Sequence, residues 1–108
     1  MPAYFIVDNE VTDPTGFEEY RKQVPHTVEK YGGKFLVRGG EIQTLEGYWK
    51  PKRIVVTEFP SIEQARQWYD SEEYRALKAL RSRTARGSVV LVEGVVLAAV
   101  GEAVRAGR

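Results

Sequence analysis

Three charged residues stand at the ends of predicted β-strands: Asp8, Arg38 and Arg53. Arginine binds oxyanions through two parallel N–H donors, so a carboxylate flanked by two guanidinium groups could orient a small anionic substrate. The same three residues could instead form a structural ion pair that holds the strand ends together. Substrate binding by this group requires the three residues to share one end of neighbouring strands.

His26 is the single histidine of the chain, and histidine is the residue type that exchanges protons near neutral pH. It is therefore the candidate catalytic proton carrier. An unbroken helix would place it opposite the apolar stripe, in solvent, whereas a kink at Pro25 could turn it toward a cleft. Two strand-end glutamates, Glu58 and Glu93, flank Tyr4 and are a weaker acid–base candidate. One histidine and no cysteine predict no metal site, and no cofactor motif appears.

The elements that must position these residues can be predicted from composition and periodicity. Four segments are rich in β-branched and aromatic residues, as strands are: 3–9, 34–38, 53–59 and 88–93. Capping signals predict helices that begin near Pro14, Ser61 and Ser71. Gly39-Gly40 is interpreted as a bulge inside a strand that continues towards Gly47, and Arg86-Gly87 as the end of the last helix.

The resulting order is β-α-β-β-α-β, an α+β ferredoxin-like arrangement. Right-handed crossovers then predict an antiparallel sheet of spatial order 4-1-3-2. This order brings Asp8, Arg53 and Arg38 to one end of three adjacent strands. The two crossover connections place their helices on one face of this sheet only, yet the strand centres are apolar on both faces. We therefore expect a homodimer in which two sheets pack face to face.

Several segments match a known family in order and spacing. They are Thr12-Asp13-Pro14, the run Tyr31 to Gly40, Leu45-Glu46-Gly47, Glu58-Phe59-Pro60-Ser61, Ala65 to Tyr69, Ser71 to Tyr74 and Val92-Glu93-Gly94. Together they resemble the bacterial domain-of-unknown-function family numbered thirteen-thirty. The resemblance implies a dimeric α/β-barrel within a superfamily that includes cofactor-free monooxygenases and isomerases. It carries over no catalytic residue.

Composition limits the function further. Sixteen basic residues balance fifteen acidic ones, which gives no field for nucleic acid. No signal peptide or membrane span is predicted, so the expectation is a cytoplasmic protein. Residues 1–95 form the predicted domain, and 96–108 a tail that is partly disordered. Two functions stay open: a cofactor-independent, oxygenase- or isomerase-like enzyme for a small polar or anionic metabolite, or a non-catalytic dimer that binds a metabolite or partner.

Overall fold

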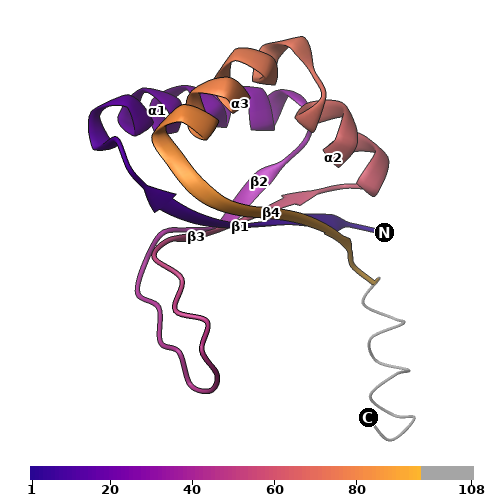
Figure 1. The fold of residues 1–108 in the computed structure, drawn as a ribbon. Helices are drawn as coiled ribbons and strands as arrows, with labels where there is room; N and C mark the ends of the chain where they lie inside the picture. Colours follow the sequence, from indigo (N-terminus) through magenta and orange to yellow (C-terminus); the bar gives the residue numbers. More distant parts are fainter. Residues whose placement is uncertain (96–108) are drawn as a thin grey trace, which may run out of the picture.

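A computed structural model describes residues 1–95, and the predicted tail 96–108 lies outside the described residues. The strands and helices follow one another as β1 (Ala3–Val11), α1 (Pro14–Lys30), β2 (Lys34–Arg38), β3 (Ile54–Phe59), α2 (Ile62–Tyr69), α3 (Glu72–Thr84) and β4 (Ala85–Glu93). Figure 1 shows the helices on one side of a single twisted sheet. We call the helix-covered side of the sheet the inner face and the opposite side the outer face.

The sheet has the order β2-β3-β1-β4, and each neighbouring pair is antiparallel. This confirms the predicted α+β ferredoxin-like fold and its strand order. The second crossover contains two helices, as the caps at Ser61 and Ser71 predicted: each serine hydroxyl accepts a hydrogen bond from the backbone N–H three residues on. Asp13 caps α1 in the same way, and Pro14 occupies its first turn.

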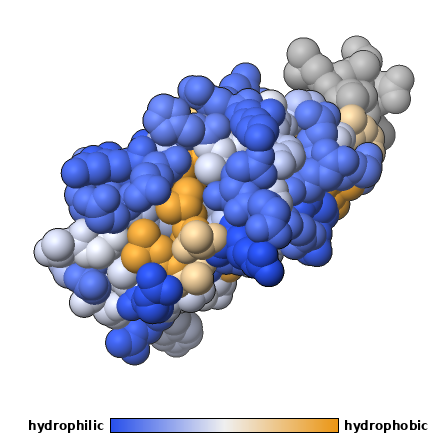
Figure 2. All heavy atoms as spheres, turned by 90° about the horizontal axis from the view of Figure 1, so that it is seen from above, coloured by the Kyte–Doolittle hydropathy of each residue, from blue (hydrophilic) through white to orange (hydrophobic). Residues whose placement is uncertain are grey.

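The core lies between the inner face and the helices. Its fully or nearly buried members are Ala3, Phe5, Phe17, Tyr20, Val24, Val28, Phe59, Ala65, Trp68, Tyr74, Leu77 and Ala85. Aromatic rings dominate, and most contacts between them are edge-to-face or tilted, which suits the ring quadrupoles. Figure 2, seen from the helix side, shows a largely hydrophilic surface with a short strip of apolar atoms near its middle.

The centre of the outer face is apolar and has no covering element within residues 1–95. One row of aliphatic residues crosses all four strands, because the register aligns Val37 with Val56, Val56 with Ile6, and Ile6 with Val90. Val37 and Val90 are 42% and 53% exposed. The predicted apolar second face is therefore present in the protomer.

Two predicted boundaries are wrong. Gly39-Gly40 does not continue β2: both glycines have positive φ angles, 76° and 110°, and this backbone leaves the ladder. Residues 39–53 instead form a long loop that projects beyond the outer face (Figure 1). Trp49 ties this loop to the sheet, since its Nε1–H donates to Asp8 Oδ2 at 3.0 Å. The last helix ends at Thr84 rather than at Arg86, and β4 starts at once.

Candidate functional site

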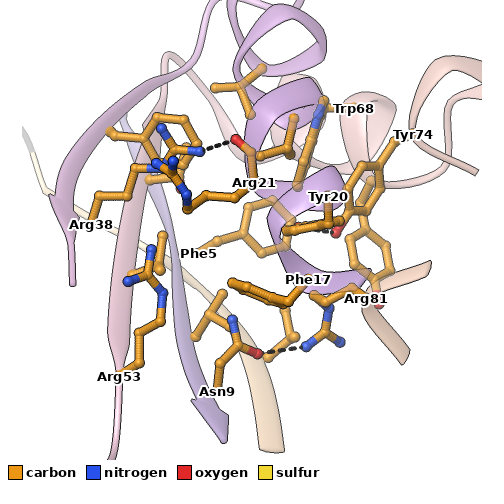
Figure 3. Close-up of a pocket in the computed structure, with 18 residues that line it drawn as sticks. Phe5, Asn9, Phe17, Tyr20, Arg21, Arg38, Arg53, Trp68, Tyr74 and Arg81 are labelled. Atoms are coloured by element: carbon orange, nitrogen blue, oxygen red, sulfur yellow. Dashed lines mark hydrogen bonds between the residues drawn. The ribbon is translucent and has the colours of Figure 1, made fainter. Parts of the chain in front are cut away.

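A partly enclosed cavity lies between the inner face and the helices (Figure 3). Its walls are aromatic and aliphatic, with polar groups at a few points. The lining residues that carry polar or cationic groups are Asn9, Tyr20, Arg21, Arg38, Arg53, Thr57, Trp68, Tyr69, Tyr74 and Arg81. A mostly apolar cavity with a few converging polar groups is the usual form of a small-molecule site.

Arg38 and Arg53 form one side of the cavity. Arg38 closes β2 and pairs in register with Val55, and Arg53 immediately precedes β3, where its carbonyl accepts from the Asn9 N–H at 2.9 Å. The Arg53 guanidinium lies beside Gly39: a Cβ at that glycine would stand 2.5 Å from Arg53 Nη1. Its central carbon lies 5.8 Å from the centre of the Phe17 ring. Gly39 therefore gives the guanidinium the space it occupies.

Arg81 forms the other side of the cavity. It extends from the last turns of α3 and donates from Nη1 to Asn9 Oδ1 at 3.0 Å, and Asn9 is only 2% exposed. Figure 3 shows Arg81 and Arg53 on separate sides of Phe17. Among the described residues, the buried Nε atoms of Arg53 and Arg81 have no hydrogen-bond partner. A buried donor without a partner is costly, so each is an available donor for a ligand.

Tyr20 and Tyr74 form a buried hydroxyl pair in the wall next to Arg81. Their oxygens lie 2.8 Å apart. Burial raises the pKa of the Tyr20 hydroxyl far above its ordinary value, and the neighbouring Tyr74 raises it further. Burial also raises the pKa of Tyr74. Both hydroxyls therefore stay protonated at physiological pH and act as hydrogen-bond donors or neutral acceptors.

The cavity is strongly cationic. Four arginines line it, and within residues 1–95 no aspartate or glutamate does. Burial and the nearby charges of Arg21 and Arg53 lower the pKa of Arg38, which shows that the cations disfavour one another. Glu18 pairs with Arg21 at 2.7 Å on the exposed side of α1, and its charge partly opposes the lowering of the Arg38 pKa. An anion inside the cavity would relieve this repulsion.

The cavity is small. The cavity volume is about 40 Å³, and the empty space rises to about 540 Å³ when the open solvent at its mouth is included. The volume of about 40 Å³ exceeds the roughly 10–15 Å³ that one water needs on the same measure. Because the volume of about 540 Å³ includes solvent, the volume of about 40 Å³ sets the size of an enclosed ligand. A compact acid, such as one with a single ring, fits this space better than an extended ligand.

The chain's family follows from its sequence pattern. The pattern of the family described as domain of unknown function (DUF1330) matches residues 2–95. The chain belongs to this family. No curated protein matches it.

Solved structures of other proteins share the fold of this chain. The Rhodopseudomonas palustris protein of unknown function RPA0582 superposes with a TM-score of 0.72 at 15% identity, covering 88% of this chain and 83% of its own. SnoaB, a cofactor-independent oxygenase from Streptomyces nogalater, gives 0.60 at 12% identity, with 88% and 94% covered. An ethyl tert-butyl ether D family protein from Bacillus halodurans gives 0.53 at 13%, with 88% and 99% covered. Identities this low show a common fold and nothing further.

In this DUF1330 chain the structure brings two of the four predicted site residues together. Arg38 and Arg53 share the cavity, whereas Asp8 lies on the outer face, bound by Trp49. His26 is exposed and does not line the cavity. His26 lies opposite the buried stripe of α1, because the helix continues through Pro25 and does not turn this residue toward the cavity.

The weaker acid–base candidate is separated by the register. Glu58 of β3 pairs with Tyr4 of β1, whereas Glu93 of β4 pairs with Ala3, the residue before Tyr4. Successive residues of a strand point to opposite faces, so the two carboxylates lie on opposite faces of the sheet. Glu58 is also held 3.4 Å from Lys34 on the outer face. The two glutamates cannot act on one substrate within a protomer.

Several polar residues of the DUF1330 cavity were not predicted as site residues, among them Asn9, Tyr20, Tyr74 and Arg81. Tyr20 and Tyr74 belong to the buried stripes of α1 and α3, as core residues do, and Arg81 lies in the last turn of α3, where a positive charge is favourable without a ligand. Asn9 carried a usable signal. It continues the alternation Phe5, Val7, Asn9 on the inner face, where a buried amide needs a partner.

Proposed function

We propose that this protein binds a small anionic metabolite in the cavity between the inner face and the helices. The observation that carries the proposal is the charge of the lining: four arginines and, among the described residues, no carboxylate. Surface arginines are usually solvated or paired, whereas Arg38, Arg53 and Arg81 are each partly buried here. Partly buried cations without an acidic partner favour a ligand that supplies the negative charge.

The proposed ligand has an apolar body and an oxyanion head. Arg53 presents a guanidinium whose donors have no protein partner among the described residues, and planar guanidinium groups bind carboxylates through two hydrogen bonds. Phe5, Phe17 and Trp68 supply the apolar wall for the body. The buried hydroxyls of Tyr20 and Tyr74 can contact a second polar group. This description fits a carboxylic acid carried by one small ring.

A cofactor-independent enzyme is the second candidate. The arginines and the protonated tyrosines form a set of donors that would stabilise negative charge developing on a substrate oxygen. The described lining supplies no histidine or carboxylate as a base. This favours an oxygenase-like reaction of a substrate that binds already ionised over an isomerase-like reaction, which needs a proton carrier. The shared fold with SnoaB supports this candidate by analogy only.

We further propose that the working unit is a homodimer joined through the outer face. The aliphatic row Val37–Val56–Ile6–Val90 is half exposed in the protomer and would be buried between two sheets. The loop 39–53 projects past the same face and carries exposed Leu45 and Tyr48. A surface of this kind on a soluble domain is typical of a contact between chains.

The experiment is a calorimetric titration with benzoate, in buffer free of phosphate and sulfate because those anions would compete. Wild-type protein should bind benzoate and should not bind benzyl alcohol, which has the same ring without the charge. Arg53→Ala should weaken benzoate binding at least about tenfold, the size of a lost charge-assisted hydrogen bond.

Lys52→Ala is the matched control, since it removes the same charge from an exposed neighbour. It should bind benzoate as the wild type does. Equal binding of benzoate and benzyl alcohol, or equal losses in the two variants, would refute an anion site at Arg53. Binding of benzoate without turnover under dioxygen would favour the non-catalytic candidate.

A further inference from the structure

Pro25 lies in the interior of α1, where proline is normally excluded. Proline has no N–H, so the hydrogen bond from position 25 to the carbonyl of Arg21 cannot form. The ring also crowds that carbonyl and tilts it away from the helix axis. α1 nevertheless runs from Pro14 to Lys30 as a single helix. The sequence therefore releases one particular backbone acceptor in the middle of an otherwise complete helix.

The released acceptor is used by the cavity. Arg38 Nη2 donates a hydrogen bond to the carbonyl oxygen of Arg21, and Figure 3 shows this bond at the cavity wall. The contact joins the end of β2 to the middle of α1, and both residues line the cavity. The side chain of Arg21 forms an ion pair with Glu18. The contact of Arg21 with Arg38 is made through its backbone carbonyl.

A carbonyl acceptor has a consequence that a carboxylate would not have. A carboxylate beside Arg38 would fix the guanidinium and also cancel its charge, leaving little attraction for an anion. The Arg21 carbonyl is neutral, so it fixes the direction of the guanidinium and leaves the positive charge in place. The Phe35 ring, 4.5 Å from the guanidinium carbon, supports the same orientation from one face.

We propose that Pro25 is a positioning residue for the anion site: because it has no N–H to donate, the Arg21 carbonyl stays available as the acceptor that orients Arg38 toward the cavity. This inference rests on the proposed anion-binding function for its effect on affinity. Its structural part, the dependence of Arg38 on residue 25, stands on the hydrogen bond alone. An ordered guanidinium loses less freedom on binding, which is how such a device raises affinity.

The test is the variant Pro25→Ala, which restores the N–H and lets the helix reclaim the Arg21 carbonyl. Two measurements are made on the folded protein, whose helix content is checked first by circular dichroism. NMR of the Arg38 Nε–Hε group should show slow rotation about the Nε–Cζ bond in the wild type and faster rotation in the variant. Benzoate affinity should fall on the order of fivefold, the size of one lost hydrogen bond, although the helix has gained one.

Gln23→Ala is the matched control. Gln23 is exposed on the same helix, and its replacement strengthens the helix without changing any donor to the Arg21 carbonyl. It should leave the Arg38 rotation and the benzoate affinity unchanged. Unchanged Arg38 rotation in Pro25→Ala would overturn the positioning role even if benzoate binds tightly. Absence of benzoate binding in the wild type would count against the anion site, and the NMR comparison would still decide the role of Pro25.

Discussion

The two faces of this sheet are built from the same strands, but one is lined by positive charge and the other exposes apolar side chains. On the inner face, Val55 lines a cavity that has four arginines and, among the described residues, no acidic side chain in its wall. On the outer face, the next residue, Val56, belongs to an aliphatic row that is half open to solvent. Alternation along a strand is what separates these environments, since successive side chains point to opposite faces. One face lacks a negative charge and the other lacks an apolar cover.

The difference suggests that the faces serve two kinds of recognition. An apolar surface gains free energy from burial over a wide area and with little direction, as an interface between copies does. A cluster of guanidinium groups gains it from one correctly placed oxyanion. Substitutions at neighbouring positions should therefore produce effects that do not overlap.

The largest expected effect is on assembly, in Val56→Lys. In a paired dimer the two-fold axis would bring two new charges into the apolar contact, at a cost of several kcal/mol each. The dimer dissociation constant should rise about a thousandfold or more. Sedimentation velocity would report a folded monomer. Val56 is not fully buried in the protomer, so the fold should survive.

Val55→Lys is the matched comparison, because it adds the same charge one residue earlier. It should leave the dimer intact and abolish benzoate binding, because the longer lysine side chain would fill the space beside Val55 in the small cavity. If Val56→Lys stayed a dimer of unchanged affinity, the outer face would not be the contact surface. If Val55→Lys dissociated the dimer and kept its benzoate affinity, the two faces would have been assigned the wrong way round.

A smaller effect is expected at Gly39→Ala, on the inner side. A methyl group there would meet the Arg53 guanidinium at 2.5 Å, and the φ angle of 76° is unfavourable for alanine by roughly 1–2 kcal/mol. Benzoate affinity should fall about tenfold because Arg53 must move. Gly47→Ala is the control: it has a similar φ of 89° in the same loop and open space around it. A loss of affinity that was equal in both variants would trace the effect to the loop backbone rather than to Arg53.

Much of the fold could be predicted because it depends on signals close together in the chain. The caps at Asp13, Ser61 and Ser71, together with strand composition and crossover handedness, were sufficient for element order and sheet order. The loop 39–53 was missed because a glycine pair predicts a bulge and a strand end equally well. The choice depends on φ angles that the sequence does not specify.

The site was only half predictable for a geometric reason. Strand order placed Asp8, Arg38 and Arg53 at one end of the sheet, but the face of each side chain depends on register and on the irregularity between Phe35 and Val37. A shift of one residue exchanges the faces, and Asp8 proved to lie on the outer one. Arg81 and the tyrosines come from helices, and their convergence depends on how those helices pack on the sheet.

The smallest expected effect concerns the Tyr20–Tyr74 pair and appears only in alkali. Because burial raises the pKa of Tyr20 in the folded state, the unfolded chain loses this proton first as pH rises. The stability due to the neutral pair is complete below about pH 10 and falls above it, by up to about 1.4 kcal/mol per pH unit for each such tyrosine. Tyr20→Phe should cost about 1 kcal/mol at pH 7, through the lost hydrogen bond. Above pH 10 its free energy of unfolding should fall less steeply than that of the wild type, so the two values converge. Urea unfolding from pH 7 to 11 measures this difference, and parallel pH dependences would mean that Tyr20 ionises in the folded protein as readily as in the unfolded chain.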